Sequence, residues 1–106
     1  MHWKVELKET VVDDLRWFGR KTGRTILAAA TAMLGSDPLE ESKSMKSLRP
    51  NPFAHRELRL FGKYRVLFNL NEEESTVTIL LVGEKQGNQL VVQGQEFHGH
   101  ESDSAE

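Results

Sequence analysis

The chain of 106 residues contains no cysteine. This absence excludes a disulfide framework and a thiolate nucleophile, and a zinc site would need His and carboxylate ligands alone. No apolar run approaches the roughly 20 residues that a membrane span requires, so we expect no membrane partner. With no cysteine to oxidise, a reducing cytoplasm is the expected location. The length suits one domain with a single modest core.

The formal net charge of −2 conceals a strong division along the chain. Residues 1–70 carry 13 Lys/Arg against 8 Asp/Glu, whereas residues 71–106 carry 1 against 8. Local potential, rather than net charge, governs where a phosphate backbone docks, so a nucleic-acid partner remains open. The most basic stretch, residues 43–65, has Glu57 as its one acid among these cations: Lys43, Lys46, Arg49, Arg56, Arg59, Lys63 and Arg65.

The first third of the chain has the pattern of one strand followed by two helices. Residues 3–7 alternate apolar and polar side chains, which predicts a short strand with one buried face. Residues 10–18 have helical spacing, and the first helix is expected to end at Gly19 or Gly23. Thr25 is expected to cap a second helix, packed antiparallel to the first. The apolar stripe of this helix is Ile26, Ala29, Ala30, Met33 and Leu34.

The rest of the chain has the pattern of an antiparallel meander. Residues 40–52 are polar and contain prolines, which predicts a connection without secondary structure. Three strands are expected near residues 57–61, 64–70 and 76–82, and Gln89–Val92 is a candidate fourth. The fold class is therefore α+β, with the N-terminal strand, a two-helix hairpin on one face, and a mainly antiparallel sheet of three to four meander strands.

The alternation within the meander divides the sheet into two faces. Leu58 and Leu60 share one face, which we expect to be core, while Glu57 and Arg59 lie on the other, which we expect to face solvent. Arg65 is the single charged residue in an otherwise apolar strand. We expect one domain over residues 1–96, followed by a polar, acidic tail over residues 97–106.

Three short motifs, in this order, carry a resemblance to a known family. They are the basic strand that ends at Gly62, the Tyr64-Arg65-Val66 triplet, and the Val82-Gly83-Glu84-Lys85 ending. With the helical hairpin and the Lys46-Ser47-Leu48 segment before them, residues 3–85 resemble the RelE/ParE superfamily of bacterial type II toxins. The resemblance implies a toxin that a cognate antitoxin neutralises. Its RelE branch cuts mRNA in the ribosomal A site, and its ParE branch poisons DNA gyrase.

The resemblance also implies roles for individual residues. In the RelE reaction the 2′-hydroxyl of the RNA attacks the adjacent phosphate, and the protein supplies cations and proton transfer. Arg59, Arg65 and Lys85 match positions that orient the phosphate and stabilise transition-state charge. His55, beside the basic strand, is an acid/base candidate. Further RNA contacts are expected from the remaining cations of the basic stretch: Lys43, Lys46, Arg49, Arg56 and Lys63.

We expect mRNA on the ribosome and a cognate antitoxin as partners, and no cofactor, metal or small-molecule ligand. His98, His100 and Glu101 are residue types that bind metals, but a glycine-flanked polar tail does not favour a rigid site. The simpler alternative for Arg59 and Arg65 is that they are strand residues that face solvent and have no functional role. In that case Arg65 would pair with Glu57 across the hairpin.

Two positions depart from the pattern of the ribonucleolytic members. Glu57 stands where those members have a basic residue. Its carboxylate would repel a phosphate unless Arg56 substitutes for that basic residue. The tyrosine that many of them carry shortly after the Lys85 position is missing, and Val91 cannot transfer a proton. The main hypothesis, which rests on Arg59, Arg65 and Lys85, is an mRNA endoribonuclease that inhibits translation. The alternatives are a toxin-fold protein that acts by binding, either as a ParE-like gyrase inhibitor or as an antitoxin-binding module, and an interaction domain without toxic action.

Overall fold

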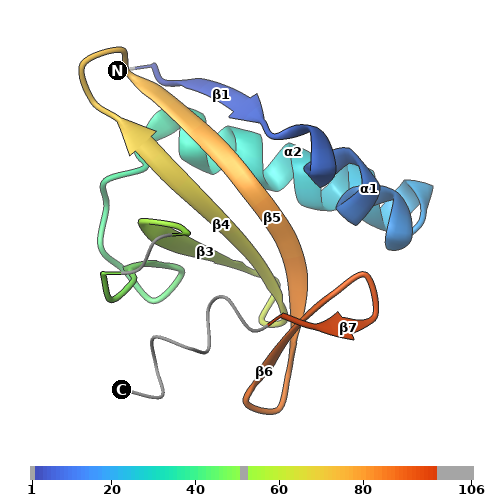
Figure 1. Cartoon of the computed structure of the whole chain (residues 1–106). Coiled ribbons are helices and arrows are strands. Elements are labelled where there is room, and N and C mark those ends of the chain that lie inside the picture. The colour runs from blue at the N-terminus through green and yellow to red at the C-terminus, as the bar shows by residue number, and fades with distance from the viewer. Residues whose placement is uncertain (1, 51–52, 98–106) are drawn as a thin grey trace.

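The computed structural model describes residues 2–50 and 53–97 and shows a two-layer α+β fold (Figure 1). Two helices, α1 (Glu9–Trp17) and α2 (Arg20–Ser36), lie against one face of a single sheet. This confirms the predicted fold class. The strands are β1 (Lys4–Leu7), β2 (Met45–Ser47), β3 (Arg56–Leu60), β4 (Tyr64–Asn71), β5 (Thr76–Gln86), β6 (Gln89–Val92) and β7 (Gln95–Glu96).

The long strand β5 organises the sheet. Strands β2 to β7 are antiparallel neighbours in chain order, as a meander requires. β4 pairs with β5 along one edge, from Tyr64↔Glu84 to Asn71↔Thr76. The other edge of β5 is shared, because β1 pairs in parallel with its first residues and β6 pairs antiparallel with its last. The N-terminal strand therefore lies beside the first half of β5 and does not pair with β2 or β7 at the ends of the meander.

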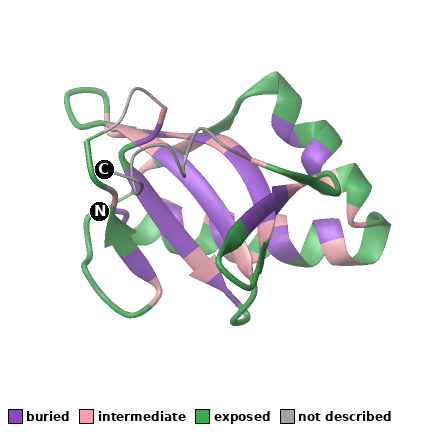
Figure 2. Ribbon diagram, turned by 60° about the horizontal axis from the view of Figure 1, so that its bottom comes forward, coloured by how far each residue is buried: buried purple, intermediate pink, exposed green. Residues whose placement is uncertain are grey.

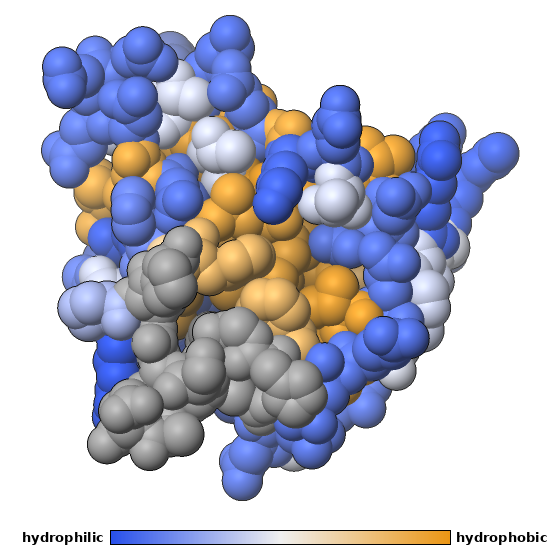
Figure 3. Space-filling view, in the orientation of Figure 1, coloured by the Kyte–Doolittle hydropathy of each residue, from blue (hydrophilic) through white to orange (hydrophobic). Residues whose placement is uncertain are grey.

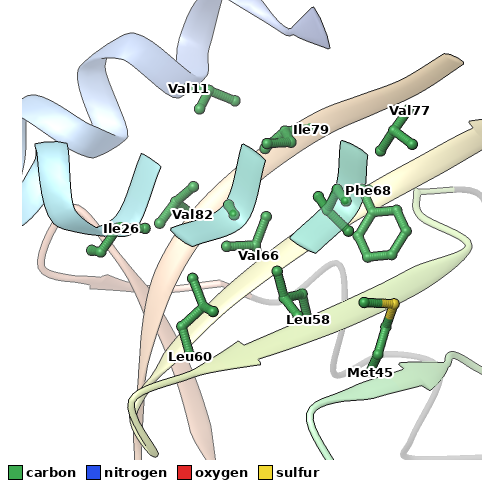
Figure 4. Close-up of a cluster of buried hydrophobic side chains, with 12 residues drawn as sticks. Val11, Ile26, Met45, Leu58, Leu60, Val66, Phe68, Val77, Ile79 and Val82 are labelled. Carbon is green, nitrogen blue, oxygen red and sulfur yellow. The ribbon is translucent and has the colours of Figure 1, made fainter. Parts of the chain in front are cut away.

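The main core lies between the helices and the sheet (Figure 4). Ile26 of α2, Leu58 of β3 and Val66 of β4 belong to this core, and all three side chains are fully buried. Each such side chain contributes roughly 1.5–3 kcal/mol by leaving water. The buried residues of this core are Val11, Ile26, Ala30, Leu34, Met45, Leu58, Leu60, Val66, Phe68, Val77, Ile79 and Val82.

The opposite face of the sheet, which we name the open face, is not simply a solvent face as its alternation predicted. Leu67, Leu81 and Leu90 are buried there in a second apolar cluster, and the strands are mostly buried in Figure 2. The rings of Phe53 and Phe97 pack against this cluster with centroids 5.0 Å apart. Phe97, expected in the tail, is thus part of the packed structure. The rest of the predicted tail, including the possible metal ligands His98, His100 and Glu101, lies outside the described residues.

The boundary between the helices differs from the prediction for a steric reason. α2 begins at Arg20 instead of at Thr25, so Gly23 lies inside a helix and does not end one. A Cβ atom at Gly23 would lie 2.6 Å from the backbone oxygen of Leu15, so only glycine permits this close helix contact. The turn itself is made at Gly19, whose φ of 93° favours glycine. Met33, predicted in the apolar stripe, is 38% exposed.

Two strand predictions were also wrong. The segment 40–52 contains β2, because Met45 is buried opposite Leu58 and joins the main core. β5 continues past Val82 to Gln86, since β6 and the β3–β4 turn supply backbone partners for its end. The Lys85 N–H donates to the Lys63 carbonyl at 2.7 Å. The longer strand carries Lys85 into the sheet.

Asp14 attaches α1 to the sheet. Its side chain is buried, and one carboxylate oxygen accepts a hydrogen bond from the backbone N–H of Val82 at 3.0 Å. The other oxygen accepts from the Gln93 amide at 2.7 Å, so the β6–β7 turn is held by the same carboxylate. Neither helix is long and apolar enough to cross a bilayer, within the residues that the structure describes.

Candidate nucleic-acid interface on the open face

In the view of Figure 1 the helices lie behind the sheet, so Figure 3 looks onto the open face. Apolar residues gather at its centre, and hydrophilic residues surround them. Leu58 and Leu60 point into the helix-side core, and the alternation of β3 therefore places Glu57 and Arg59 on the open face. The same alternation in β4 places Arg65 there, between the core residues Tyr64 and Val66.

Two arginines stand opposite one another on this face. The register of β3 and β4 pairs Arg59 directly with Arg65. Like charges in this relation repel, and such pairs destabilise a sheet unless an anion lies near. The Arg59 side chain is 37% exposed, whereas Arg65 is only 7% exposed. The pair thus combines one accessible cation with one that is nearly removed from water.

The Arg65 guanidinium is only partly satisfied by its surroundings. Its Nη1 donates to the carbonyl of Tyr64 at 3.0 Å, while its Nε has no hydrogen-bond partner among the described residues. Burial lowers the pKa of Arg65, and the nearby Glu57 carboxylate acts in the opposite direction. Arginine keeps its proton in any case. A buried donor without a partner costs free energy, and the Nε of Arg56 is in the same state.

Glu57 provides the negative charge between these cations. Its Oε1 accepts from the Arg59 Nε at 3.2 Å, and its side chain is 8% exposed. Across the other edge of β3 it lies opposite Lys46 in β2. The suggested pairing of Glu57 with Arg65 is present as an electrostatic attraction, while the ion pair itself is made with Arg59. Three cations therefore surround one carboxylate.

The third expected phosphate-binding residue lies on the same face. Gly83 of β5 is opposite Arg65, and Lys85 is the next residue of β5 on that face. Lys85 and Lys63 are both exposed at the end of the β3–β4 hairpin. The structure therefore brings together Lys46, Arg59, Arg65 and Lys85, with Lys63 at the adjoining turn.

Arg56 lies on the other side of β3. It is 6% exposed, and its guanidinium donates to the carbonyl oxygens of Leu39 and Glu40 at 3.2 and 2.8 Å. It also forms an ion pair of 3.0 Å with Glu41. Arg56 thus holds the connection after α2, and it does not replace the basic residue that Glu57 displaces on the open face.

His55 lies apart from the arginine pair. It is four residues from Arg59 along an extended chain, or about 13 Å at the usual rise per residue. Its Nδ1 accepts from the Leu70 N–H at 3.2 Å, which holds the ring at the far end of the hairpin. Its backbone N–H donates to the Asn69 side-chain oxygen at 2.7 Å. Lys43, before β2 in the chain, and Arg49, after it, are both exposed.

Two further properties bear on the chemistry of this face. Leu90 is opposite Lys85 on this face and is 4% exposed, whereas Val91, which stands in place of the tyrosine, is opposite Glu84 on the other face and is 8% exposed; neither carries a transferable proton. No group of three or more His, Asp or Glu side chains within residues 2–50 and 53–97 is arranged to hold a metal ion. Sequence reasoning missed that Lys46 belongs beside Glu57. The available signal was the apolar Met45, which marks β2.

Solved structures with the same architecture identify the fold. No protein-family model and no curated protein matches the sequence. The RelBE2 toxin–antitoxin complex from Mycobacterium tuberculosis contains a chain with a TM-score of 0.69 and 26% identity, covering 80% of this chain and 93% of that one. A chain of the RelE–RelB complex from Pyrococcus horikoshii has a TM-score of 0.63 and 23% identity, covering 83% and 99%.

Isolated RelE toxin from Escherichia coli has a TM-score of 0.60 and 19% identity, covering 79% of this chain and 85% of that one. The alignments thus extend over most of both chains in each case. The chain is a RelE-like protein of the RelE/ParE type II toxin superfamily.

Proposed function

We propose that this protein is a type II toxin that cleaves mRNA on the ribosome and that binds the RNA backbone with its open face. The observation that carries the proposal is the pairing of Arg59 with Arg65 across β3 and β4. Repulsion within this pair favours an added anion. A phosphate between the two guanidinium groups would relieve it.

The two arginines differ in the work that they are suited to do. Arg65 is buried and held by the Tyr64 carbonyl, so it is fixed in place before a substrate arrives. A fixed cation in a dry site stabilises developing charge more effectively than a mobile one in water. Arg59 is more exposed and is suited to binding and orienting the phosphate.

Lys46 and Lys85 extend the positive surface on either side of the pair. Each is exposed, so each offers a point charge to neighbouring phosphates. Backbone contacts of this kind give affinity without base specificity, and they weaken steeply with salt. We therefore expect RNA binding that depends on ionic strength and discriminates little between sequences.

The solved complexes support a protein partner as well. The similar chains from M. tuberculosis and P. horikoshii are each described in complex with an antitoxin or with RelB. We infer that this toxin is likewise held inactive by a cognate antitoxin. Such a partner would be encoded beside it, as is expected for a two-component system.

Induced expression without the partner, followed by mapping of mRNA 5′ ends, tests the proposal. We expect growth to stop and new mRNA ends to appear with the wild type, and both effects to be lost with Arg59→Ala. Lys21→Ala, an exposed cation on α2, is the matched control and should remain toxic. Unchanged growth and uncut mRNA with the wild type would contradict the enzymatic function.

A second candidate is a RelE-fold protein that binds RNA or ribosomes without cleaving them. Two observations favour it, namely the Glu57–Arg59 ion pair and the buried Val91, which cannot transfer a proton in place of the missing tyrosine. This candidate predicts that the protein sediments with ribosomes while mRNA ends stay unchanged. A DNA supercoiling assay separates both candidates from a gyrase inhibitor, since neither should alter supercoiling.

A further inference from the structure

A phenylalanine occupies a turn position that does not suit it. Phe61 and Gly62 are the central residues of the turn between β3 and β4, with φ angles of 53° and 76°. A hydrogen bond of 3.2 Å from the Lys63 N–H to the Leu60 carbonyl closes this turn. Two central residues with positive φ are typical of a type I′ turn, which favours Asn, Asp or Gly at these positions. A bulky side chain there is strained, so Phe61 weakens the turn that contains it.

Burial does not compensate for this strain. Phe61 is 62% exposed, more than any other large apolar residue within residues 2–50 and 53–97. Its ring lies edge-to-face with the ring of Tyr64, with centroids 6.4 Å apart, and Phe18 packs against Tyr64 at 5.3 Å. Tyr64 is thus fixed by the core, whereas Phe61 is open to solvent. An exposed ring on a strained residue contributes little to folding, which indicates a role in binding.

Phe61 and Tyr64 line a small cleft between the hairpin and α2. Its lining includes Thr22, Thr25 and Ile26 of α2, and its volume is about 260 Å³. Clefts for drug-sized ligands have roughly 300–1,000 Å³, so this one suits a smaller group. Aromatic rings contact the faces of unstacked nucleobases, and hydroxyl groups can bind their edges. The cleft therefore offers the groups that a single base requires.

A cation lies beside this cleft. The Lys63 Nζ is 5.1 Å from the centroid of the Tyr64 ring, which is within cation–π distance. Among the described residues that line the cleft, none is acidic. Glu84 lies opposite Tyr64 in β5 but is not part of the lining. A nucleotide thus meets an aromatic surface for its base and a positive charge for its phosphate at the end of the hairpin.

The cleft is continuous with the basic residues of the open face. Phe61 is two residues beyond Arg59, or about 7 Å along an extended strand. The Lys63 carbonyl accepts from the Lys85 N–H at 2.7 Å, which joins the turn to the end of β5. Arg59 lies on the open face, whereas Tyr64 packs on the helix-side core. An RNA strand held at Arg59 therefore reaches the cleft by passing round the turn.

We propose that the cleft at the β3–β4 turn binds one unstacked base of single-stranded mRNA, with Phe61 as the stacking surface and Lys63 beside the phosphate. The inference rests on the proposed function, in which the open face binds the backbone of the same strand, and it adds a contact with a base. Stacking accepts every base, since each has an aromatic face, so this contact raises affinity with little choice of sequence. An apolar side chain of a protein partner would also cover Phe61, but it would leave the charge of Lys63 unused.

The test compares two short single strands with equal numbers of phosphates, an oligouridine and its abasic counterpart, by fluorescence anisotropy at fixed salt. We expect Phe61→Asn and Phe61→Leu to weaken binding of the oligouridine at least about fivefold and to leave binding of the abasic strand unchanged. Phe61→Trp keeps an aromatic surface and should retain the affinity. Phe61→Asn should not lower the melting temperature, because asparagine suits the positive φ of the turn. Leu39→Asn, at an exposed leucine after α2, is the matched control.

The outcomes separate this inference from the proposed function. Unchanged oligouridine binding by Phe61→Asn and Phe61→Leu, while Arg59→Ala weakens it, overturns the base contact and leaves the open face as the RNA-binding surface. Equal losses on both strands, in folded variants, also overturn the base contact. No binding of either strand by the wild type contradicts RNA binding by the open face, and the inference fails with it. A selective loss on the oligouridine supports the inference, whether or not the wild type cuts mRNA.

Discussion

Replacement of Glu57 by Gln removes the negative charge that lies among the cations that we propose to bind phosphate. The carboxylate is 3.2 Å from the Arg59 Nε and is almost buried. Glutamine keeps the shape and one accepting oxygen, so Arg59 keeps a neutral partner. We expect the variant to bind RNA more tightly than the wild type.

The size of the effect follows from Coulomb's law. For two unit charges about 6 Å apart, at an effective dielectric constant of about 20, the repulsion between carboxylate and phosphate is roughly 3 kcal/mol. Because the Arg59 side chain is 37% exposed, solvent screening reduces this to roughly 1–2 kcal/mol, which corresponds to about a 5- to 30-fold lower Kd. The same change leaves the buried Arg65 with less compensation. Stability should therefore fall by about 1–3 kcal/mol.

Fluorescence anisotropy with a short single-stranded RNA, at fixed salt, measures the affinity, and a thermal melt measures the stability. The control is Glu73→Gln, which changes the net charge equally at the exposed β4–β5 turn. Equal or weaker RNA binding by Glu57→Gln, relative to this control, would refute the assignment of Glu57 as the anion that competes with phosphate.

Three further changes test individual contacts of the fold. Gly23→Ala, normally stabilising in a helix, should instead cost about 1–3 kcal/mol in a denaturant titration, because its Cβ would meet the Leu15 oxygen; a gain in stability would disprove the close contact. Asp14→Ala should lower the free energy of unfolding by roughly 2–4 kcal/mol in the same titration, since the Val82 N–H and the Gln93 amide lose their acceptor. A loss below about 0.5 kcal/mol, which is typical of surface substitutions, would contradict the role of Asp14 as a buried acceptor. The Ser47 hydroxyl donates to Glu41 at 2.7 Å and, as the main cause, lowers the pKa of Glu41. This contribution is present above the unfolded pKa and is lost as pH falls through the folded one, so Ser47→Ala should raise the Glu41 pKa in an NMR titration; an unchanged value would exclude the hydroxyl as its cause.

The sequence was sufficient for the fold class because the strong signals are local. Alternation in β3 assigned Leu58 and Leu60 to one face, and the structure buries both. The first helix was expected to end at Gly19 or Gly23, and the sequence could not decide between them because glycine has two uses. It ends helices, but it also permits close contact with another backbone, and only the position of Leu15 decides between them.

The site was predictable in part. Arg59, Arg65 and Lys85 share a face because side-chain alternation is a local property, and the motifs placed them on neighbouring strands. The burial of Arg65 and the exclusion of Arg56 from this face depend on which elements cover each side of β3. Those contacts join residues distant in sequence, such as Arg56 with Glu40, and composition and spacing do not encode them.

The central claim is that the opposed arginines of the open face act on mRNA. Its most direct test is mapping of mRNA 5′ ends on ribosomes purified after brief induction of the wild type, Arg59→Ala and Arg65→Lys. Arg65→Lys keeps the buried charge and removes the guanidinium geometry. The account predicts new ends with the wild type and their loss in both variants, with all three proteins folded. Equal cleavage by all three proteins, or none by the wild type, would contradict it.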